Sequence, residues 1–297
     1  MTIARISTYA WLAFAAVSIF WGTTFFAIRI GVESFPPFLM AAFRHSIGGI
    51  LICSYFLLRG YSIPAWPSLK VFAINGFLML VIGNGLVTWA EMYVSSGLAA
   101  IICSLTPIWI VGFNSFTKGK ELLNTKIVTG FVLCLLAQLL IFKNSMDEFS
   151  NANYTMGIVF VLIANIAWAL GSVYSKNHHT ETHPLFGAGL QMISGGVTLH
   201  IIGASMGEWQ HFSPNGEALW ALAYLIVFGS ILAYGCYMYI LKNMPATIVS
   251  TYAYINTVVA VVMGWLWLNE QLTMEMFAGV LVTLSGLWLV NKGMNKA

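Results

Sequence analysis

Long runs of apolar residues, separated by short polar turns, set the pattern of this chain. Each run is about twenty residues long, which is the length that a helix needs to cross the hydrocarbon core of a bilayer. Charges, prolines and glycines separate these runs, which predict ten membrane-spanning helices. They are expected over residues 9–30, 36–58, 69–90, 96–117, 125–143, 154–176, 184–206, 217–241, 246–268 and 273–291. The chain is therefore predicted to be an all-α polytopic membrane protein.

The composition agrees with this pattern. Of the 297 residues, 59% are hydrophobic and 8% are charged, whereas soluble domains carry about 25% charged residues. A soluble globular fold and a disordered chain are both excluded. The first apolar run follows Arg5 and has no small-residue cleavage site, so we expect it to be retained as a helix and not removed as a signal peptide.

Neither a metal site nor a disulfide framework is predicted. The four cysteines lie inside apolar runs without partners at metal-ligand spacing, and are expected to be small packing residues. The histidine-rich loop over residues 178–183 matches no standard metal site, so a solvated cytoplasmic turn is the preferred interpretation. We expect no metal, no cofactor and no nucleic-acid partner.

Lysine and arginine residues lie mostly on one side of the predicted membrane. With the N-terminus in the cytoplasm, ten of the 13 fall on the cytoplasmic side, two (Arg29 and Lys143) on the other, and Arg44 inside the second helix. Basic residues favour the cytoplasmic face. An even number of spans also places Lys292 and Lys296 there, so both termini are predicted to be cytoplasmic.

The two halves of the chain match each other weakly. A shift of 147 residues places Trp21 on Trp168 and the Gly48-Gly49 pair on Gly195-Gly196, and a shift of 149 places Gly130 on Gly279. Apolar helices align at many shifts, but these shared positions favour a duplication. Five helices are an odd number, so the second half would be inserted in the opposite orientation, as in many secondary transporters. The expected halves, residues 1–145 and 146–297, would enclose a central cavity.

Several short motifs occur in order along the chain: Trp21-Gly22-Thr23-Thr24, Ala42-Phe43-Arg44, Ser96-Gly97-Leu98-Ala99-Ala100, Leu105-Thr106-Pro107 and Asn269-Glu270-Gln271-Leu272-Thr273. Together they resemble the EamA family of the drug/metabolite transporter superfamily. The chain departs from the family pattern at Thr257, where a proline is usual, and at Lys120, where an acidic residue is expected. The resemblance implies a carrier of small metabolites in the plasma membrane (the bacterial inner membrane), often an exporter of amino acids.

Arg44 lies deep in the second predicted helix, about 12 Å from Pro36 along its axis. A charge at this depth costs roughly 2.5–3.5 kcal/mol on insertion scales. It can attract a substrate carboxylate or hold two helices together, and we favour the structural role. The neighbouring His45 lies about 100° further around the helix, so the two side chains are not expected to face one point. His45 could titrate, but a packed neutral histidine is preferred.

Asn84, Thr88 and Glu91 lie at i, i+4 and i+7 on one stripe of the third helix. Lipid would not tolerate this stripe, so it is predicted to face the interior. Glu91 lies near the outer end, where it either sits among lipid headgroups or acts as a gating or proton-coupling carboxylate. Asn84 lies deeper and has Tyr234 as its repeat counterpart at a shift of 150. Both are predicted to line the cavity.

Trp21 and Thr24 in the first helix correspond to Trp168 and Ser172 in the sixth. Both tryptophans lie about halfway along their spans, where an interfacial aromatic girdle is not expected. A cavity wall is the preferred interpretation for all four residues.

Three further residues complete the predicted substrate site. Tyr252 and Asn256 share one face of the ninth helix, and Gln191 is the uncharged repeat counterpart of Arg44. This asymmetry would let one half bind an anionic group while the other half supplies neutral hydrogen bonds.

The sequence therefore predicts a transporter of small polar metabolites that works by alternating access. Coupling could run through His45 or Glu91, or the protein could be a uniporter or an exchanger. The alternatives are an intramembrane enzyme acting on a lipid or acyl substrate, for which no nucleophile or acid/base pair is found, and a receptor or scaffold. The expected partners are a small-molecule substrate and the bilayer, in a monomer or a weak homo-oligomer.

Overall fold

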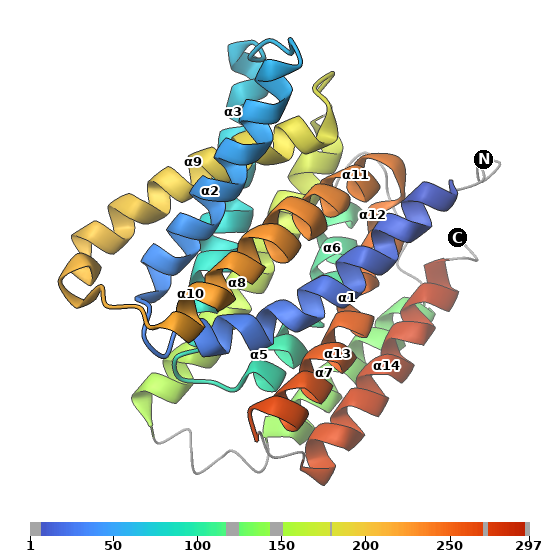
Figure 1. Ribbon diagram of the computed structural model, residues 1–297. Coiled ribbons are helices and arrows are strands. Elements are labelled where there is room, and N and C mark those ends of the chain that lie inside the picture. Colours follow the sequence, from blue (N-terminus) through green and yellow to red (C-terminus); the bar gives the residue numbers. More distant parts are fainter. Residues whose placement is uncertain (1–6, 117–124, 143–150, 179, 270–272, 295–297) are drawn as a thin grey trace.

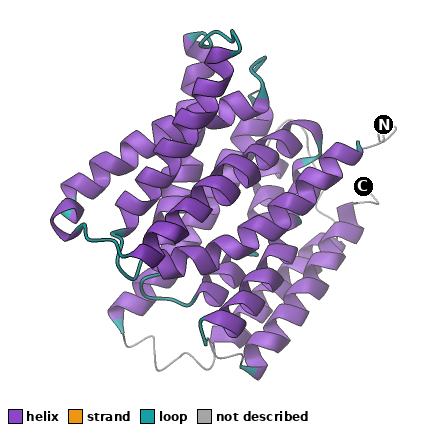
Figure 2. Ribbon diagram, viewed as in Figure 1, coloured by secondary structure: helices purple, strands orange, loops and turns teal. Residues whose placement is uncertain are grey.

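The computed structural model describes residues 7–116, 125–142, 151–178, 180–269 and 273–294. Every regular element among these residues is a helix (Figure 2). The predicted all-α fold class is confirmed. Lys120 and its acidic neighbour Glu121 lie outside the described residues, and so do Lys143 and Glu270.

Apart from one short 3-10 helix in the second half, the described elements follow the same order twice along the chain. The first half contains α1 (Thr8–Gly31), α2 (Pro37–Leu58), α3 (Trp66–Asn75), η1 (Gly76–Gly85), α4 (Leu86–Ala90), α5 (Ser96–Cys103), α6 (Thr106–Ser115) and α7 (Thr125–Phe142). The second half contains α8 (Ala152–Asn177), α9 (Pro184–Ser205), η4 (Glu208–His211), α10 (Gly216–Tyr224), η5 (Leu225–Tyr234), α11 (Gly235–Asn243), α12 (Ala246–Ser250), α13 (Tyr252–Trp267) and α14 (Met274–Met294).

All ten predicted positions are helical, and eight of them are long and apolar enough to cross a membrane within the described residues. The eight are Thr8–Gly31, Pro37–Leu58, Trp66–Ala90, Ser96–Ser115, Ala152–Asn177, Pro184–Ser205, Gly216–Asn243 and Ile248–Trp267. The remaining two, α7 and α14, contain shorter apolar stretches, Thr125–Cys134 and Met274–Gly286. The chain is a multi-pass membrane protein, and ten crossings stay a prediction.

Four of the spans are less regular than the sequence pattern predicts. The third and eighth contain the π-helical segments η1 and η5, which begin at Gly76 and Leu225. The fourth span is interrupted at Ser104 and Leu105, between α5 and α6, and the ninth at Thr251, between α12 and α13. π-Helical turns are rare and often lie at functional sites. Because both kinds of irregularity occur in both halves, they support the repeat.

Helices that correspond in the two halves pack against each other. A Cβ atom on Gly49 of α2 would lie 2.9 Å from the carbonyl oxygen of Gly189 in α9, and one on Gly286 of α14 would lie 2.7 Å from the carbonyl oxygen of Gly130 in α7. Glycine is needed at such contacts because the backbones approach closely, as is common between membrane helices. Figure 1 shows α7 and α14 side by side at one edge of the bundle.

The remaining long helices surround the middle of the molecule. α1 packs against α13, η5 and α10, while α8 packs against η1 and α6. The first turn of α1 and the last turn of α14 lie at the same end of the molecule in Figure 1. The centre is thus enclosed by helices from both halves.

Candidate functional site

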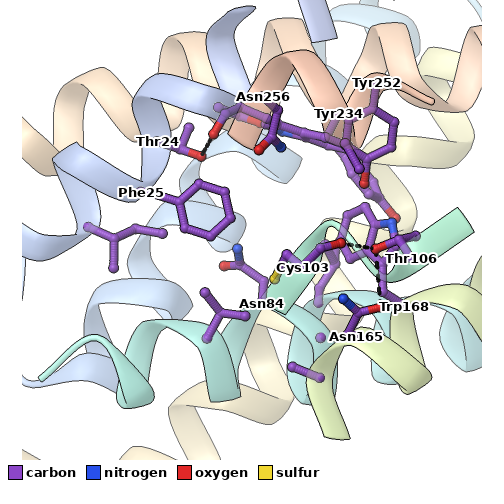
Figure 3. Close-up of a pocket in the computed structure, with 18 of the residues that line it drawn as sticks. Thr24, Phe25, Asn84, Cys103, Thr106, Asn165, Trp168, Tyr234, Tyr252 and Asn256 are labelled. Atoms are coloured by element: carbon purple, nitrogen blue, oxygen red, sulfur yellow. Dashed lines mark hydrogen bonds between the residues drawn. The ribbon is translucent and has the colours of Figure 1, made fainter. Parts of the chain in front are cut away.

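A cavity lies at the centre of the bundle, and its wall comes from both halves of the chain. The first half contributes residues of α1, α2, η1, α4, α5 and α6, and the second half contributes residues of α8, η5 and α13. The cavity has about 700 Å³ of space between protein atoms, counted with its mouth. Figure 3 shows side chains from these helices surrounding an open space.

Nine of the residues that the sequence singles out line this cavity. They are Trp21, Thr24, Arg44, His45, Asn84, Trp168, Tyr234, Tyr252 and Asn256. They come from six elements that lie far apart in the sequence, so the fold brings them together. The other four residues, Thr88, Glu91, Ser172 and Gln191, are not part of this wall.

Aromatic rings form one side of the cavity. The ring centroids of Trp21 and Trp168, the pair related by the repeat, lie 5.1 Å apart at 83°. Trp21 is also 5.1 Å from Tyr252, and Trp168 is 6.1 Å from Tyr234. Edge-to-face pairs at such distances are favourable. The indole N–H of Trp21 donates to the carbonyl oxygen of Gly229 in η5 at 3.0 Å, which fixes this ring against the π-helical segment.

Arg44 is the only charged residue among the described lining residues. Its Nε donates to Oγ of Ser230 at 2.8 Å, and its Nη1 donates to Oδ1 of Asn84 at 3.4 Å. Both partners are neutral, and the acidic group that acts on the guanidinium electrostatically is Glu91. Arg44 thus links α2 to η1 and η5 and also presents a positive charge to the cavity.

The expectation that Arg44 and His45 cannot face one point is wrong. Nε2 of His45 lies 3.0 Å from Oδ1 of Asn84, the same atom that Arg44 contacts. The long arginine side chain spans the angle between the two positions, and Asn84 lies on η1 where it reaches both. Which ring nitrogen of His45 carries the proton depends on its tautomer.

Two polar cavity residues were missed by the sequence reasoning. Asn165 of α8 donates from Nδ2 to the carbonyl oxygen of Ile102 at 2.9 Å, and its Oδ1 accepts from Oγ1 of Thr106 at 3.1 Å. The carbonyl groups at the end of α5 need partners because the helix stops at Cys103. Only a prediction of this break could have identified Asn165, since it otherwise reads as one amide in an apolar run.

Thr257, the departure from the family pattern in the ninth span, has a role in packing. Its Oγ1 lies 3.0 Å from the carbonyl oxygen of Ala100 in α5 and 2.7 Å from that of Ala253 in its own helix. A proline at this position would have no hydroxyl to link α13 to α5.

Three buried polar atoms in the cavity wall have no hydrogen-bond partner within the described residues: Nδ1 of His45, Nε1 of Trp168 and Oδ1 of Asn256. The side chains of His45 and Asn256 are 2% and 5% exposed. Since buried polar atoms are nearly always paired, such atoms are available to water or to a bound solute.

Three predicted residues that do not line the cavity make other contacts, within their own span or with another helix. Oγ1 of Thr88 donates to the carbonyl oxygen of Asn84 at 2.9 Å, and the hydroxyl groups of Ser172 and Tyr237 share a hydrogen bond of 2.7 Å. Glu91 follows α4 and is fully buried. Its backbone carbonyl oxygen accepts a hydrogen bond from Nη1 of Arg29.

The fourth such residue, Gln191, lies directly behind the cavity wall. Its Oε1 accepts a 2.5 Å hydrogen bond from the hydroxyl of Tyr234, and its side chain lines a separate cavity. The tyrosine thus belongs to the central cavity and the glutamine to its neighbour.

Basic side chains bind the carboxyl ends of two corresponding helical spans. Nζ of Lys176 donates to the carbonyl oxygens of Leu241 and Met244 at 2.8 and 2.9 Å, at the end of α11. Arg29 precedes Lys176 by 147 residues, and its acceptor on Glu91 precedes Leu241 by 150. Cations are favourable at helix C-termini. The same contact is therefore made in both halves.

The comparison with known proteins agrees with this architecture. The chain is 37% identical to the uncharacterized inner membrane transporter YedA of Escherichia coli K12, over 92% of this chain and 90% of that protein. It is 25% identical to the uncharacterized transporter YoaV of Bacillus subtilis, over 94% and 95% of the two chains. A solved crystal structure shares the fold with a TM-score of 0.71 at 17% identity, covering 95% of this chain and 97% of the other.

The family comparison matches both halves of the chain. The model of the EamA-like transporter family matches residues 8–143 and again residues 155–292. The two matches cover almost all of the described helices. The chain therefore belongs to the EamA-like transporter family.

Proposed function

We propose that this protein exports a small polar organic solute, such as an amino acid, across the bacterial inner membrane. The observation that carries the proposal is the central cavity, whose wall combines aromatic rings, amide groups and one cation from both halves of the chain. Ligand sites are typically apolar clefts with a few well-placed polar groups. The relation to an inner membrane transporter supports the location.

The lining residues favour a solute with an anionic group and a compact apolar part. Arg44 supplies a positive charge, and the described lining residues include no acidic side chain. The carboxyl group of Glu91, outside the cavity wall, interacts with Arg44 electrostatically. Asn84 and Asn256 offer amide groups, and the tryptophan pair offers ring faces. The membership of a transporter family favours transport over the alternative of an intramembrane enzyme.

The proposed mechanism is alternating access between two inverted halves, residues 1–145 and 146–297, with ten crossings and both termini in the cytoplasm. The repeated element order and the shared end of α1 and α14 support this topology. Helix pairs would rock to expose the cavity to each face in turn. The protein would work as a monomer or a weak homo-oligomer.

Coupling through His45 or Glu91 is also a proposal. His45 lines the cavity, and its Nδ1 has no hydrogen-bond partner among the residues that the structure describes. Glu91 lies outside the cavity wall, at the end of α4. His45 is thus the residue that a bound solute could contact directly.

The test is binding followed by flux. Purified protein is screened by thermal shift against amino acids, nucleosides and sugars, and each hit is measured by counterflow of labelled solute in proteoliposomes. We expect Trp168→Ala and Asn84→Ala to lose the thermal shift. Trp220→Ala is the matched control, because Trp220 is 79% exposed and lies outside the cavity.

Unchanged binding in both cavity variants would remove the assignment of the site. Absence of flux for every solute, combined with turnover of a lipid by the purified protein, would favour the enzyme instead.

A further inference from the structure

A second cavity lies between α3, α8, α9 and α11, behind the wall of the central cavity. We refer to it as the α9 pocket, and its lining includes Ser175, Lys176, Thr182, His183, Gln191 and Lys242. It has about 480 Å³ of space between protein atoms, counted with its mouth. Its mouth is formed by the turn between α8 and α9 and by the end of α11.

The two cavities extend toward opposite ends of the molecule. In the central cavity, Ile28 and Val87 lie near the carboxyl ends of α1 and α4. The α9 pocket reaches the turn that joins α8 to α9. Figure 1 places that turn and the end of α1 at opposite ends of the bundle.

The polar groups of the α9 pocket favour an anion. Two lysines, Lys176 and Lys242, lie in its wall, and no acidic residue is present among its described lining residues. Lys176 is held by carbonyl oxygens at the end of α11, whereas the side chain of Lys242 is exposed. Burial, and then the charge of Lys242, lower the pKa of His183. The histidine is therefore neutral at pH 7, and the positive charge comes from the lysines.

Gln191 gives this pocket an amide N–H group that has no acceptor among the described residues. Its side chain is fully buried, and its Nε2 has no hydrogen-bond acceptor within the described residues. An amide N–H left unpaired in a buried site is costly, so an acceptor atom bound in the pocket would stabilise it. A carboxylate or phosphate oxygen is such an acceptor, and the nearby cations would favour it.

The wall between the two cavities contains one strong hydrogen bond. The hydroxyl of Tyr234, in the central cavity, donates to Oε1 of Gln191, in the α9 pocket, at 2.5 Å. Gln191 follows Arg44 by 147 residues and is its repeat counterpart. Corresponding positions of the two halves thus line the two cavities, one with a charge and one with an amide.

We propose that the α9 pocket is a second binding site, for the anionic group of the transported solute, at the end of the bundle opposite the one toward which the central cavity extends. The Tyr234–Gln191 pair is the partition that must separate before a solute passes from one cavity to the other. This inference rests on the proposed transport function, because it treats both cavities as parts of one path.

The first experiment measures the charge preference of the pocket. In full-length protein whose four native cysteines are replaced by alanine, Ser175→Cys places a thiol in the pocket wall, and Ser62→Cys places one in an exposed turn. Each thiol is reacted with a sulfonated and with a trimethylammonium methanethiosulfonate reagent. The ratio of the two rates reports the local electrostatic potential.

We expect the ratio to favour the anionic reagent about tenfold more at position 175 than at position 62, because one unit charge at a partly buried site changes such rates by this order. Adding Lys242→Gln should remove most of the difference. Equal ratios at the two positions would overturn the anion site. Protection of position 175 by phosphatidylglycerol liposomes, but not by phosphatidylcholine liposomes or soluble phosphate, would assign the pocket to a lipid headgroup and overturn the solute site.

The second experiment tests the partition. Cys103 lines the central cavity, so a variant that keeps this cysteine alone reports entry into that cavity. Membrane-impermeant reagent is applied from each side, in right-side-out and inside-out vesicles. Cys103 and Ser175→Cys should react from opposite sides. Reaction of both from one side would overturn the two-ended path.

Removing the partition bond should expose Cys103 from the side of the α9 pocket. We expect Tyr234→Phe and Gln191→Leu each to raise the rate at which Cys103 reacts with reagent from that side about fivefold, the factor that corresponds to one net hydrogen bond. Tyr237→Phe is the matched control, since it deletes another buried tyrosine hydroxyl, bonded to Ser172. An equal rise in the control, or no rise in either variant, would overturn the role of the pair. These rates do not depend on solute flux, so failure of the proposed function is seen separately.

Discussion

The adjacent glycines Gly48 and Gly49 in α2 allow a sharp test of how the two halves pack. A Cβ atom on Gly49 would lie 2.9 Å from both the carbonyl oxygen of Gly189 and the backbone nitrogen of Ile193 in α9. The nearest neighbour of a Cβ atom on Gly48 would be Cβ of Ser230 at 3.4 Å, an ordinary van der Waals distance. One alanine therefore collides with backbone that cannot move aside, and the other fits.

The magnitude follows from two opposing terms. Replacing glycine by alanine inside a helix stabilises by about 0.5–1 kcal/mol at either position. Overpacking against backbone costs about 1–3 kcal/mol, and only Gly49→Ala suffers it. The difference between the two variants removes the common helix term and should be about 1–3 kcal/mol. For a chain of 297 residues, this corresponds to a difference of about 2–5 °C in Tm.

The assay is thermal unfolding of both variants in the same detergent, followed by intrinsic tryptophan fluorescence. Gly48→Ala should have a Tm equal to or slightly above that of the unmodified protein, and Gly49→Ala should lie below it. Gly112→Ala is a second control, because a Cβ atom there would have no neighbour within 4 Å. Equal melting temperatures for Gly48→Ala and Gly49→Ala would refute the backbone contact between α2 and α9.

Three further predictions concern single hydrogen-bonding groups, each measured by Tm in detergent. Trp21→Phe keeps a ring in the aromatic wall but loses the bond to Gly229, and should cost about 1 kcal/mol; an unchanged Tm would contradict that bond. Glu208→Ala removes the carboxylate that accepts the N–H groups at the start of α2 and should cost about 0.5–2 kcal/mol, whereas Glu208→Gln keeps an acceptor and should lose less. Burial raises the pKa of the Glu208 carboxyl group, so the folded protein binds its proton more tightly than the unfolded chain does. The contribution of Glu208 to the free energy of unfolding should therefore fall as pH rises above its unfolded pKa near 4.3. Glu208→Gln should lack this pH dependence. Asn165→Leu removes the side-chain donor to the carbonyl group of Ile102, which keeps its bond from the N–H of Leu105, and also removes the acceptor of Thr106 Oγ1. The two lost hydrogen bonds should together cost about 1–3 kcal/mol, an estimate that an unaltered Tm would rule out.

The sequence is sufficient to predict where the helices lie, because apolar runs of membrane length have few alternatives. All ten predicted segments are helical in the structure. The interruption at Ser104 and Leu105 has a signal in Pro107, in the first turn of α6, because proline disrupts a helix interior. Its exact position, and the π-helical segments η1 and η5, have no such signal. They depend on which backbone groups find partners on neighbouring helices, as Ile102 does on Asn165.

The candidate site was predictable where a polar residue is unusual for its surroundings. Trp21 and Trp168 lie midway along apolar helices, and both line the cavity. Ser172 stands out equally well in the sequence but bonds to Tyr237. Whether a side chain reaches a cavity or a neighbouring helix is decided by helix rotation within a few tens of degrees, and periodicity does not determine rotation that finely.

The contacts made by Arg29 and Lys176 have a consequence for regulation. Both cations are bound by backbone carbonyl oxygens, at Glu91 and at Leu241 and Met244. An amide carbonyl does not ionise, whereas a carboxylate acceptor can take up a proton when its pKa is raised. Acidifying or alkalising either compartment near neutrality therefore leaves the acceptors at both helix ends unchanged, so any response of these two contacts to protons has to come from the cations themselves.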